Sequence, residues 1–325
     1  MKKYELIKET ETCFEEREIF RIRALKDFGN VRAGDVGGWV CSEDNLSQKG
    51  ECWIYDDAKC LDNAIMYDNA VMCGNAIMYD SSVMRDNAKM FGDTMMYGSS
   101  EMRDNAEMYD YSEMFGDAMM LDNAIMFDYT RMFDNTRMYG NSVMYGNAEM
   151  RDNARMCDKA IMWNYAKMSG NARMYGNAEM HDSSLMCDNA RMFDNTRMFD
   201  NSMMYDNAKM YNNAKMFNNS KMYGNATMFD YAILDENKIL YGSINKSYKK
   251  IFQYHCEKRL ITAILTEVNE ILYSVGCKIG MTKEEFIDRI YNDCKIKGKG
   301  LEEYPHRQEY LDMIDIVENY LKKFI

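Results

Sequence analysis

The chain has 325 residues, of which 47% are hydrophobic and 28% are charged, and its formal net charge is −12. This size suffices for a folded core, and the negative charge argues against nonspecific binding to nucleic acid. No apolar run is long enough to span a membrane, and the charged start Met1-Lys2-Lys3 is unlike a signal peptide, so we expect a cytoplasmic protein.

The ten cysteines form no Cys-x-x-Cys pair. Such cysteines are typical of free thiols in a reducing compartment. Because clustered ligands are lacking, the sequence predicts no metal site, and we expect no cofactor.

Residues 1–50 predict a β cap. Apolar and polar residues alternate in two stretches, Tyr4–Ile7 and Ile19–Arg23, which a charged link joins. This alternation is typical of half-buried strands, so we expect a β-hairpin. A hairpin here would cover the exposed strand edges at the end of a solenoid.

A methionine occupies every sixth position from Met66 to Met228, which makes twenty-eight units in one frame. The residue two before each Met is Ala, Ser or Thr, and the residue two after it is Asp, Gly or Asn, usually followed by Asn. In an extended segment the small residue and the Met face the same side, the interior, whereas Asp, Gly and Asn tolerate a tight bend. The pattern predicts a mainly β fold, with a parallel β-solenoid over residues 51–244 and stacked Asn amides at its corners. An α-helix is excluded, because methionines six residues apart would be distributed around all sides of a helix with 3.6 residues per turn and would form no single buried face.

The hexapeptide pattern resembles that of left-handed β-helices, best known from acyltransferases, with Met in the usual Leu, Ile or Val position. The leading segment is Val31-Arg-Ala-Gly-Asp-Val-Gly-Gly-Trp39-Val40, followed by Asn45-Leu46-Ser47-Gln48 and Cys52-Trp53-Ile54-Tyr55-Asp56. It resembles the YdcK-like bacterial and phage hexapeptide proteins. Over residues 1–240 this resemblance implies a left-handed winding and three six-residue units, or 18 residues, in each coil.

The position after each Met builds an aromatic column on one face when coils contain 18 residues. The column comprises Phe91, Tyr109, Phe127, Tyr145, Trp163, His181, Phe199 and Phe217. We expect these rings mainly to stack on one another. The alternative is a binding surface, with Trp163 as its candidate contact.

The position before each Met builds a basic column on a second face. It comprises Arg137, Arg155, Arg173, Arg191 and Lys209, with Tyr139, Tyr175, Phe193 and Tyr211 beside it. Like charges one coil apart repel each other. In one interpretation, corner residues Asp158 and Asp194 and cation–π contacts offset this repulsion. In the other, the column is a docking strip for an acidic partner. The same position in earlier coils holds Ile65, Val83, Glu101 and Met119. We therefore predict that the basic column, its aromatic neighbours and Trp163 bind a partner.

His181 is the one histidine of the repeat. Acyltransferases of the left-handed β-helix family generally use a histidine near a subunit boundary, often under a projecting loop. No loop interrupts the frame between Ala64 and Met228, and no phosphate-binding loop or nucleophile elbow is present. The sequence favours His181 as a polar substitute in the aromatic column, and it assigns no catalytic residue.

Residues 245–325 predict an α-helical unit. The pattern of apolar residues favours a long helix from about residue 247 to 273, a second helix opened by a capping box at Thr282–Glu285 and ending near Cys294, and a third helix over His306–Phe324. Lys295–Glu303 is expected to be a charged loop. Such a unit can cap the solenoid, form homo-oligomers or hold a partner.

These features together favour a non-catalytic binding protein. From the resemblance to phage proteins, we expect a phage or mobile-element product that docks on and inhibits a host protein, for instance an immune effector such as a CRISPR component. We expect the contact to combine the helical unit with a column over residues 137–229. A trimeric hexapeptide acyltransferase and an acidic nucleic-acid mimic are the alternatives.

Overall fold

The computed structural model describes residues 2–229, 232–235, 238–243, 248–256, 259–266, 270–275, 278–296 and 305–322. The chain divides into two compact units, Met1–Asp182 and Ser183–Ile325. Both units contain coils of a parallel β-solenoid, which confirms the predicted fold class. The left-handed winding stays a prediction.

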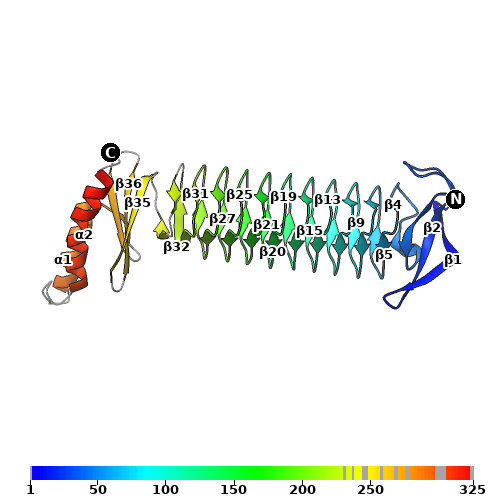
Figure 1. Cartoon of the computed structure of the whole chain (residues 1–325), viewed down its shortest axis with the longest axis horizontal. Helices are drawn as coiled ribbons and strands as arrows, with labels where there is room; N and C mark the ends of the chain where they lie inside the picture. The colour runs from blue at the N-terminus through cyan, green and yellow to red at the C-terminus, as the bar shows by residue number, and fades with distance from the viewer. Residues whose placement is uncertain are drawn as a thin grey trace. The chain divides into compact units, whose positions relative to one another are not determined.

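The first unit opens with an antiparallel β cap. β1 (Tyr4–Phe14) and β2 (Arg17–Ala24) form the predicted hairpin, and β3 (Val36–Val40) pairs with β2. A short 3-10 turn, η1 (Glu43–Asn45), follows β3. Because β3 also pairs in parallel with a solenoid strand, the cap continues directly into the first coils (Figure 1).

Three parallel faces make up the solenoid of the first unit, and each coil adds one two-residue strand to each face (Figure 1). Face A contains β5 (Lys59–Cys60), β8 (Ile77–Met78), β11 (Met95–Met96), β14 (Glu113–Met114), β17 (Arg131–Met132), β20 (Glu149–Met150) and β23 (Lys167–Met168). Face B contains β6 (Ile65–Met66), β9 (Val83–Met84), β12 (Glu101–Met102), β15 (Met119–Met120), β18 (Arg137–Met138), β21 (Arg155–Met156) and β24 (Arg173–Met174). Face C contains β4 (Trp53–Ile54), β7 (Val71–Met72), β10 (Lys89–Met90), β13 (Glu107–Met108), β16 (Ile125–Met126), β19 (Val143–Met144), β22 (Ile161–Met162) and β25 (Glu179–Met180).

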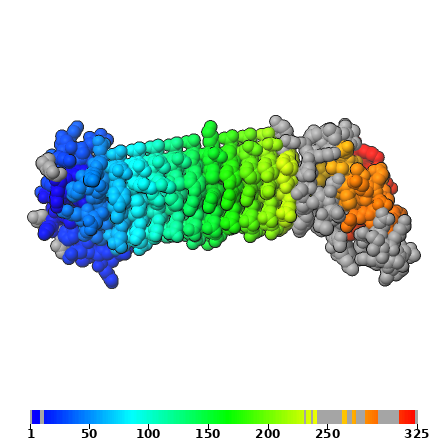
Figure 2. Space-filling view, turned by 180° about the vertical axis from the view of Figure 1, so that it is seen from behind, coloured from blue at the N-terminus to red at the C-terminus, as the bar shows by residue number. Residues whose placement is uncertain are grey.

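The register between neighbouring strands is constant. Lys89 of β10 pairs with Glu107 of β13, and Met90 pairs with Met108. These partners are 18 residues apart in the sequence, so three hexapeptides complete one coil as expected. Each position of the hexapeptide therefore repeats as a straight column along one face or corner. Figure 2 shows the first unit's surface as a series of parallel ridges.

The interior consists of methionine and small side chains. Met144 and Ser142, for example, are both fully buried, and the other units repeat this pair of inward positions. A buried Met contributes about 1.5–3 kcal/mol to folding, and its flexible thioether fills an irregular space. The hydroxyl of Ser82 donates to the Tyr79 carbonyl at 2.8 Å.

The corners show why Asp and Asn recur there. The φ angle of Asp128 is 59°, in the left-handed region that the sequence pattern predicted. Its carboxylate also accepts the backbone N–H of Gly146 in the next coil at 3.0 Å. The predicted amide ladder is present, since Nδ2 of Asn69 donates to Oδ1 of Asn87 at 3.2 Å and Asn87 donates to Asn105 in the same way. Corner Asp residues therefore act both as turn formers and as acceptors between coils.

The second unit repeats the same coil and ends in a different motif. Its solenoid strands are β26 (Leu185–Met186), β27 (Arg191–Met192), β28 (Arg197–Met198), β29 (Met203–Met204), β30 (Lys209–Met210), β31 (Lys215–Met216), β32 (Lys221–Met228), β33 (Ile233–Leu234) and β34 (Ile239–Ser243). β32 is longer and pairs with both β29 and β30.

The prediction of a long helix from about residue 247 to 273 is wrong. An antiparallel sheet occupies this segment, with strands β35 (Tyr248–Cys256), β36 (Arg259–Thr266), β37 (Ile271–Val275) and β38 (Lys278–Met281). The segment is rich in Ile, Tyr and Thr, which favour strands when neighbouring strands can pair with them. Short apolar runs do not distinguish a buried strand from a helix by spacing alone.

The two later helices are confirmed. α1 (Lys283–Ile296) begins after Thr282, whose hydroxyl accepts the Glu285 N–H at 3.2 Å while the Glu285 carboxylate accepts the Thr282 N–H at 2.9 Å, as a capping box requires. α2 (Pro305–Leu321) packs with α1 and the sheet around a cluster that includes Tyr273 and Phe286 (Figure 1). Most of the charged loop expected at Lys295–Glu303 lies outside the described residues. Neither described helix is long and apolar enough to cross a membrane.

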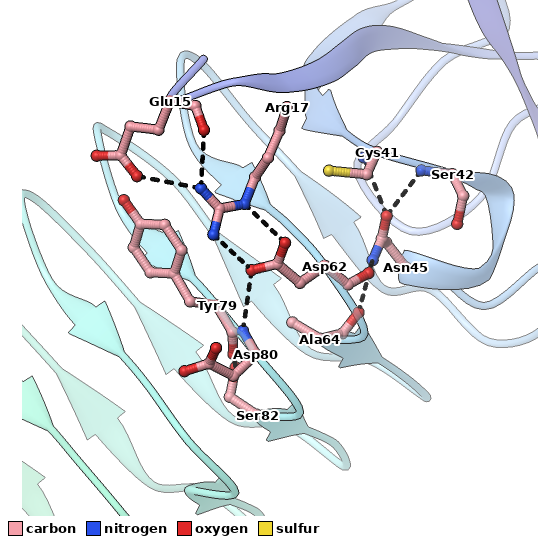
Figure 3. Close-up of polar contacts among 10 residues, drawn as sticks. All are labelled: Glu15, Arg17, Cys41, Ser42, Asn45, Asp62, Ala64, Tyr79, Asp80 and Ser82. Carbon is pink, nitrogen blue, oxygen red and sulfur yellow. Dashed lines mark hydrogen bonds and ion pairs between the residues drawn. The ribbon is translucent and has the colours of Figure 1, made fainter. Parts of the chain in front are cut away.

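A bidentate ion pair fastens the cap hairpin to the solenoid (Figure 3). Arg17 of β2 donates from Nε and Nη2 to the two carboxylate oxygens of Asp62, at 2.6 and 3.0 Å. The guanidinium also lies over the Tyr79 ring, 5.5 Å from its centroid. The buried Asn45 side chain adds bonds to the carbonyls of Asp62 and Ala64 at 3.0 and 2.9 Å. The hydrogen bonds from Arg17 hold the pKa of Asp62 below its ordinary value.

Asp62→Asn should lower the melting temperature by a few degrees at pH 7. The depressed pKa of folded Asp62 means that its contribution is fully present above the ordinary value of 3.8 and is lost as the pH falls through the folded value. The difference between wild type and variant should therefore shrink in acid, as thermal melts between pH 7 and pH 2 would show. Asp128→Asn is the control, because this corner carboxylate binds a backbone N–H and has no ion pair among the described residues. An Asp62→Asn deficit that does not change with pH would contradict this account.

Candidate functional site

Three arginines of the first unit form a column on face B. The parallel register places Arg137 beside Arg155 and Arg155 beside Arg173, in strands β18, β21 and β24. All three are partly exposed. Neighbouring strands lie about 4.8 Å apart, so three positive charges are stacked at close spacing. We call these residues the arginine column.

Three other basic residues of the first unit at the same hexapeptide position, Lys89, Arg131 and Lys167, are paired with a carboxylate. Nζ of Lys89 lies 2.9 Å from Oε1 of Glu107, and Nε of Arg131 lies 3.0 Å from Oε2 of Glu113, in each case across one coil. No carboxylate of a described residue lies within ion-pair distance of the arginine column. The column is therefore an uncompensated positive strip.

The arginine column makes few hydrogen bonds within the described part of the chain. Nη1 of Arg137 and of Arg173 donate to the hydroxyls of Tyr139 and Tyr175, both at 3.4 Å, which is long for such bonds. The Nε groups of Arg155 and Arg173 are buried and have no acceptor. An unsatisfied buried donor costs about 1–3 kcal/mol. The exposed guanidinium donors are available to an anionic group.

The corner carboxylate expected to offset the column is engaged elsewhere. Oδ2 of Asp158 accepts the backbone N–H of Gly176 at 3.0 Å. The thiol of Cys157 lies in the same region, and burial raises its pKa, with a further rise from Asp158, while Arg155 and Arg173 oppose the rise. The positive charge of the column is therefore not neutralised by an ion pair.

A hollow of about 340 Å³ adjoins one end of the arginine column. Its lining residues are Arg85, Asp86, Arg103, Asp104, Leu121, Asp122 and Tyr139. Leu121 is only 7% exposed and is shorter than Arg103 and Tyr139, which precede and follow it by one coil. The sequence-based prediction missed this hollow. The available signal was a single aliphatic residue at a position that otherwise holds long side chains in these coils.

The second unit contains a similar basic and aromatic pair. Arg191 of β27 pairs in register with Lys209 of β30. The Phe193 and Tyr211 rings beside them stack with centroids 4.7 Å apart. Nε of Arg191 is buried without an acceptor, and the Asp194 carboxylate accepts a backbone N–H of the next coil at 3.3 Å. Binding of a partner by these residues stays a prediction.

The aromatic column on face C stacks on itself, as predicted. From Phe91 to Trp163, successive ring centroids lie 4.3–5.1 Å apart, and the ring planes agree within 18°. In the second unit Phe199 and Phe217 stack at 5.0 Å. These rings are largely occupied with one another, although Trp163 is 36% exposed.

His181 lies at the end of this column in the first unit. Its ring centroid is 6.1 Å from that of Trp163, and its Nε2 is 3.1 Å from Oε2 of Glu179. This position agrees with the prediction of a polar substitute among stacked rings. In the parts of the chain that the structure describes, no three His, Cys, Asp or Glu side chains are grouped to hold a metal ion.

Comparison with known proteins gives one short match. A stretch of 36 residues is 53% identical to the "Uncharacterized acetyltransferase YdcK" of Escherichia coli (strain K12). The match covers 11% of this chain and 11% of that protein, far less than two thirds of either. No protein-family model matches the chain. Together with the 18-residue coil, the match fits a hexapeptide-repeat protein.

Arg155→Ile should leave the stability unchanged or raise it, although it removes a charged residue. Ile fills the same hexapeptide position in β16 and β22, and the change removes a buried unpaired Nε and the repulsion from two neighbouring arginines. We expect the free energy of unfolding to rise by up to about 1 kcal/mol. Chemical denaturation measures it, with Arg131→Ile, which breaks an ion pair, as the control. A loss above ~1 kcal/mol for Arg155→Ile would show that the arginine stabilises the fold.

Proposed function

We propose that this chain is a non-catalytic binding protein whose arginine column docks an acidic segment of a partner protein. The proposal is carried by the absence of ion pairs at Arg137, Arg155 and Arg173 within the described residues, next to coils in which the same position is paired. The coil itself does not require arginine there, because Ile125 and Val143 fill the equivalent position on face C. Unpaired arginines that cost stability are expected where they serve recognition.

The dimensions of the column suit an extended acidic segment. The first and third arginines of the column are roughly 10 Å apart along the solenoid axis, which is twice the ~4.8 Å spacing between neighbouring strands. Alternate residues of an extended chain are about 6.8 Å apart, so two or three carboxylates can reach the guanidinium groups at once.

We further propose that the partner is a host protein, inhibited because its acidic surface is occupied, and that the chain is a phage or mobile-element product. This part is supported by the resemblance to phage hexapeptide proteins alone.

A hexapeptide acyltransferase is the second candidate, because the similar protein YdcK carries the name of an acetyltransferase. His181 would then serve as the base, at a boundary with another subunit. In that case acetyl-CoA should raise the melting temperature, and His181→Ala should abolish the rise. If acetyl-CoA causes no shift, this candidate is eliminated.

A triple variant in which Gln replaces Arg137, Arg155 and Arg173 should bind an oligoglutamate peptide at least tenfold more weakly than wild type. The substitution removes three charges but keeps long polar side chains, so the melting curve should change little. Isothermal titration at low and moderate salt measures the effect, and wild-type affinity should fall as salt screens the charges.

The control is a triple Gln variant of Lys89, Arg131 and Lys167, which occupy the same hexapeptide position but lie beside glutamates. It should bind the peptide like wild type. Equal weakening of both triple variants would mean that net charge, and not the arginine column, attracts the peptide. With wild-type bait, host proteins captured from lysate should be lost with the column variant and retained with the control.

A further inference from the structure

A row of exposed tyrosines lies on a different edge of the first unit, at the corner between faces C and A. The third residue after each Met occupies this corner, and in four successive coils it is Tyr111, Tyr129, Asn147 and Tyr165. The tyrosines are 48%, 52% and 60% exposed, which places them among the most exposed large side chains of the solenoid. The arginine column lies on face B, so the two features are separate.

Asn147 interrupts a stack of rings. Tyr111 and Tyr129 stack with centroids 4.8 Å apart and planes within 3°. Because Asn147 takes the next position, Tyr129 and Tyr165 lie two coils apart, roughly 9.6 Å at the ~4.8 Å strand spacing. Tyr165 has no ring partner among the residues that the structure describes. The row is therefore a ring stack with one position open.

The open position is a hollow of about 230 Å³. Its lining residues are Tyr129, Arg131, Asn147, Glu149, Tyr165 and Lys167. An engineered cavity of about 150 Å³ accepts a benzene ring, so this volume is sufficient for one aromatic ring. Stacked Tyr, Phe and Trp rings of this unit have centroids 4.3–5.1 Å apart from coil to coil, so a ring inserted midway would meet both tyrosines at the spacing that stacking favours.

Asn147 contributes an exposed side-chain amide to this slot. At a neighbouring corner the Asn side chains bond from coil to coil, as Asn105 does when its Nδ2 donates to Asn123 at 3.1 Å. Tyrosines flank Asn147 on both sides, and its side chain has no hydrogen bond within the described chain. An amide both donates and accepts, and a phenol hydroxyl does the same.

The charged groups beside the slot are already paired. Nε of Arg131 lies 3.0 Å from Glu113, and Nζ of Lys167 lies 3.6 Å from Glu149, which also binds Arg151. The slot therefore presents no uncompensated positive charge to a phosphate. This favours a neutral ring over a nucleotide.

We propose that the slot between Tyr129 and Tyr165 binds one tyrosine side chain of a partner protein. The ring lies between the two tyrosines, and its hydroxyl exchanges hydrogen bonds with the Asn147 amide. A phenylalanine would leave the amide unpaired, and an indole N–H can only donate. This site is independent of the proposed role of the arginine column.

Titration with N-acetyl-tyrosinamide, followed by saturation-transfer NMR on the ligand, tests the slot. We expect saturable binding in the millimolar range, with transfer to the ligand's ring protons. Asn147→Tyr should weaken binding at least tenfold, because the chain's own ring then completes the stack, and its melting temperature should equal or exceed that of wild type. Asn153→Tyr is the matched control. It adds a ring at the same hexapeptide position on another corner, where no tyrosine precedes or follows it, and should bind like wild type.

Two further comparisons test the assignment of the ring and of the amide. N-acetyl-phenylalaninamide should bind at least threefold more weakly than the tyrosine compound, and Asn147→Ala should remove this difference. The triple Gln variant of the arginine column should bind the tyrosine compound unchanged, so a failure at either site leaves the other standing.

Three results would overturn the proposal. Equal binding by wild type and Asn147→Tyr, or no saturable binding by wild type, eliminates the slot. Equal affinity for the two amino-acid compounds eliminates the role of Asn147. Tighter binding of adenosine than of the tyrosine compound would make the occupant a nucleobase.

Discussion

Backbone hydrogen bonds from each coil to the next are the constraint on which the structure depends. The N–H of Val143 donates to the carbonyl of Ala160 at 3.0 Å, and the N–H of Tyr145 donates to Met162 at 2.9 Å, and the same pattern repeats along the coils. Strands of two residues are too short to be stable alone, so each is held by the identical strands before and after it. The register cannot slip without turning inward residues outward. Every residue type is therefore stacked on its equivalents, and side-chain columns are a direct consequence of the ladder.

Stacking at one-coil spacing favours some side chains and penalises others. Methionine, asparagine amides and aromatic rings gain contacts or hydrogen bonds from an identical neighbour, as the pair Asn87 and Asn105 shows. Charged side chains repel an identical neighbour, and Glu113 beside Arg131 shows how an alternating charge removes the repulsion. The arginine column lacks this alternation and leaves two Nε groups of the first unit buried without acceptors. One solenoid therefore contains both compensated and uncompensated positions of the same kind.

The sequence predicted most of the solenoid, because each rule was repeated in twenty-eight units: inward Met, small neighbour and bent corner. The sequence-based prediction of secondary structure failed where the repeat ends. There the pairing of β36 with β35 and with β37, and not the local spacing of apolar residues, decides that Ile and Tyr form strands. The pairing of Arg131 and the lack of it at Arg155 depend on the preceding coil, which holds Glu113 in one case and Arg137 in the other. This difference could have been found by comparing positions one coil apart. The bond from Gly176 to Asp158 could not, because Asp is also explained there by its positive φ alone.

The constant coil length also has a genetic consequence. A duplication or deletion of the codons for one 18-residue coil leaves every later side chain on its original face. An insertion of one hexapeptide, in contrast, moves all later side chains to the next face. The tyrosine slot and the arginine column of the first unit lie on different edges but share one ladder. They also occupy the same coils, because residues 129–165 of the slot and residues 137–173 of the column interleave in the sequence, so a coil inserted before these residues shifts both features together by ~4.8 Å. The distance of both features from the cap can therefore change by whole coils while their side chains keep their faces.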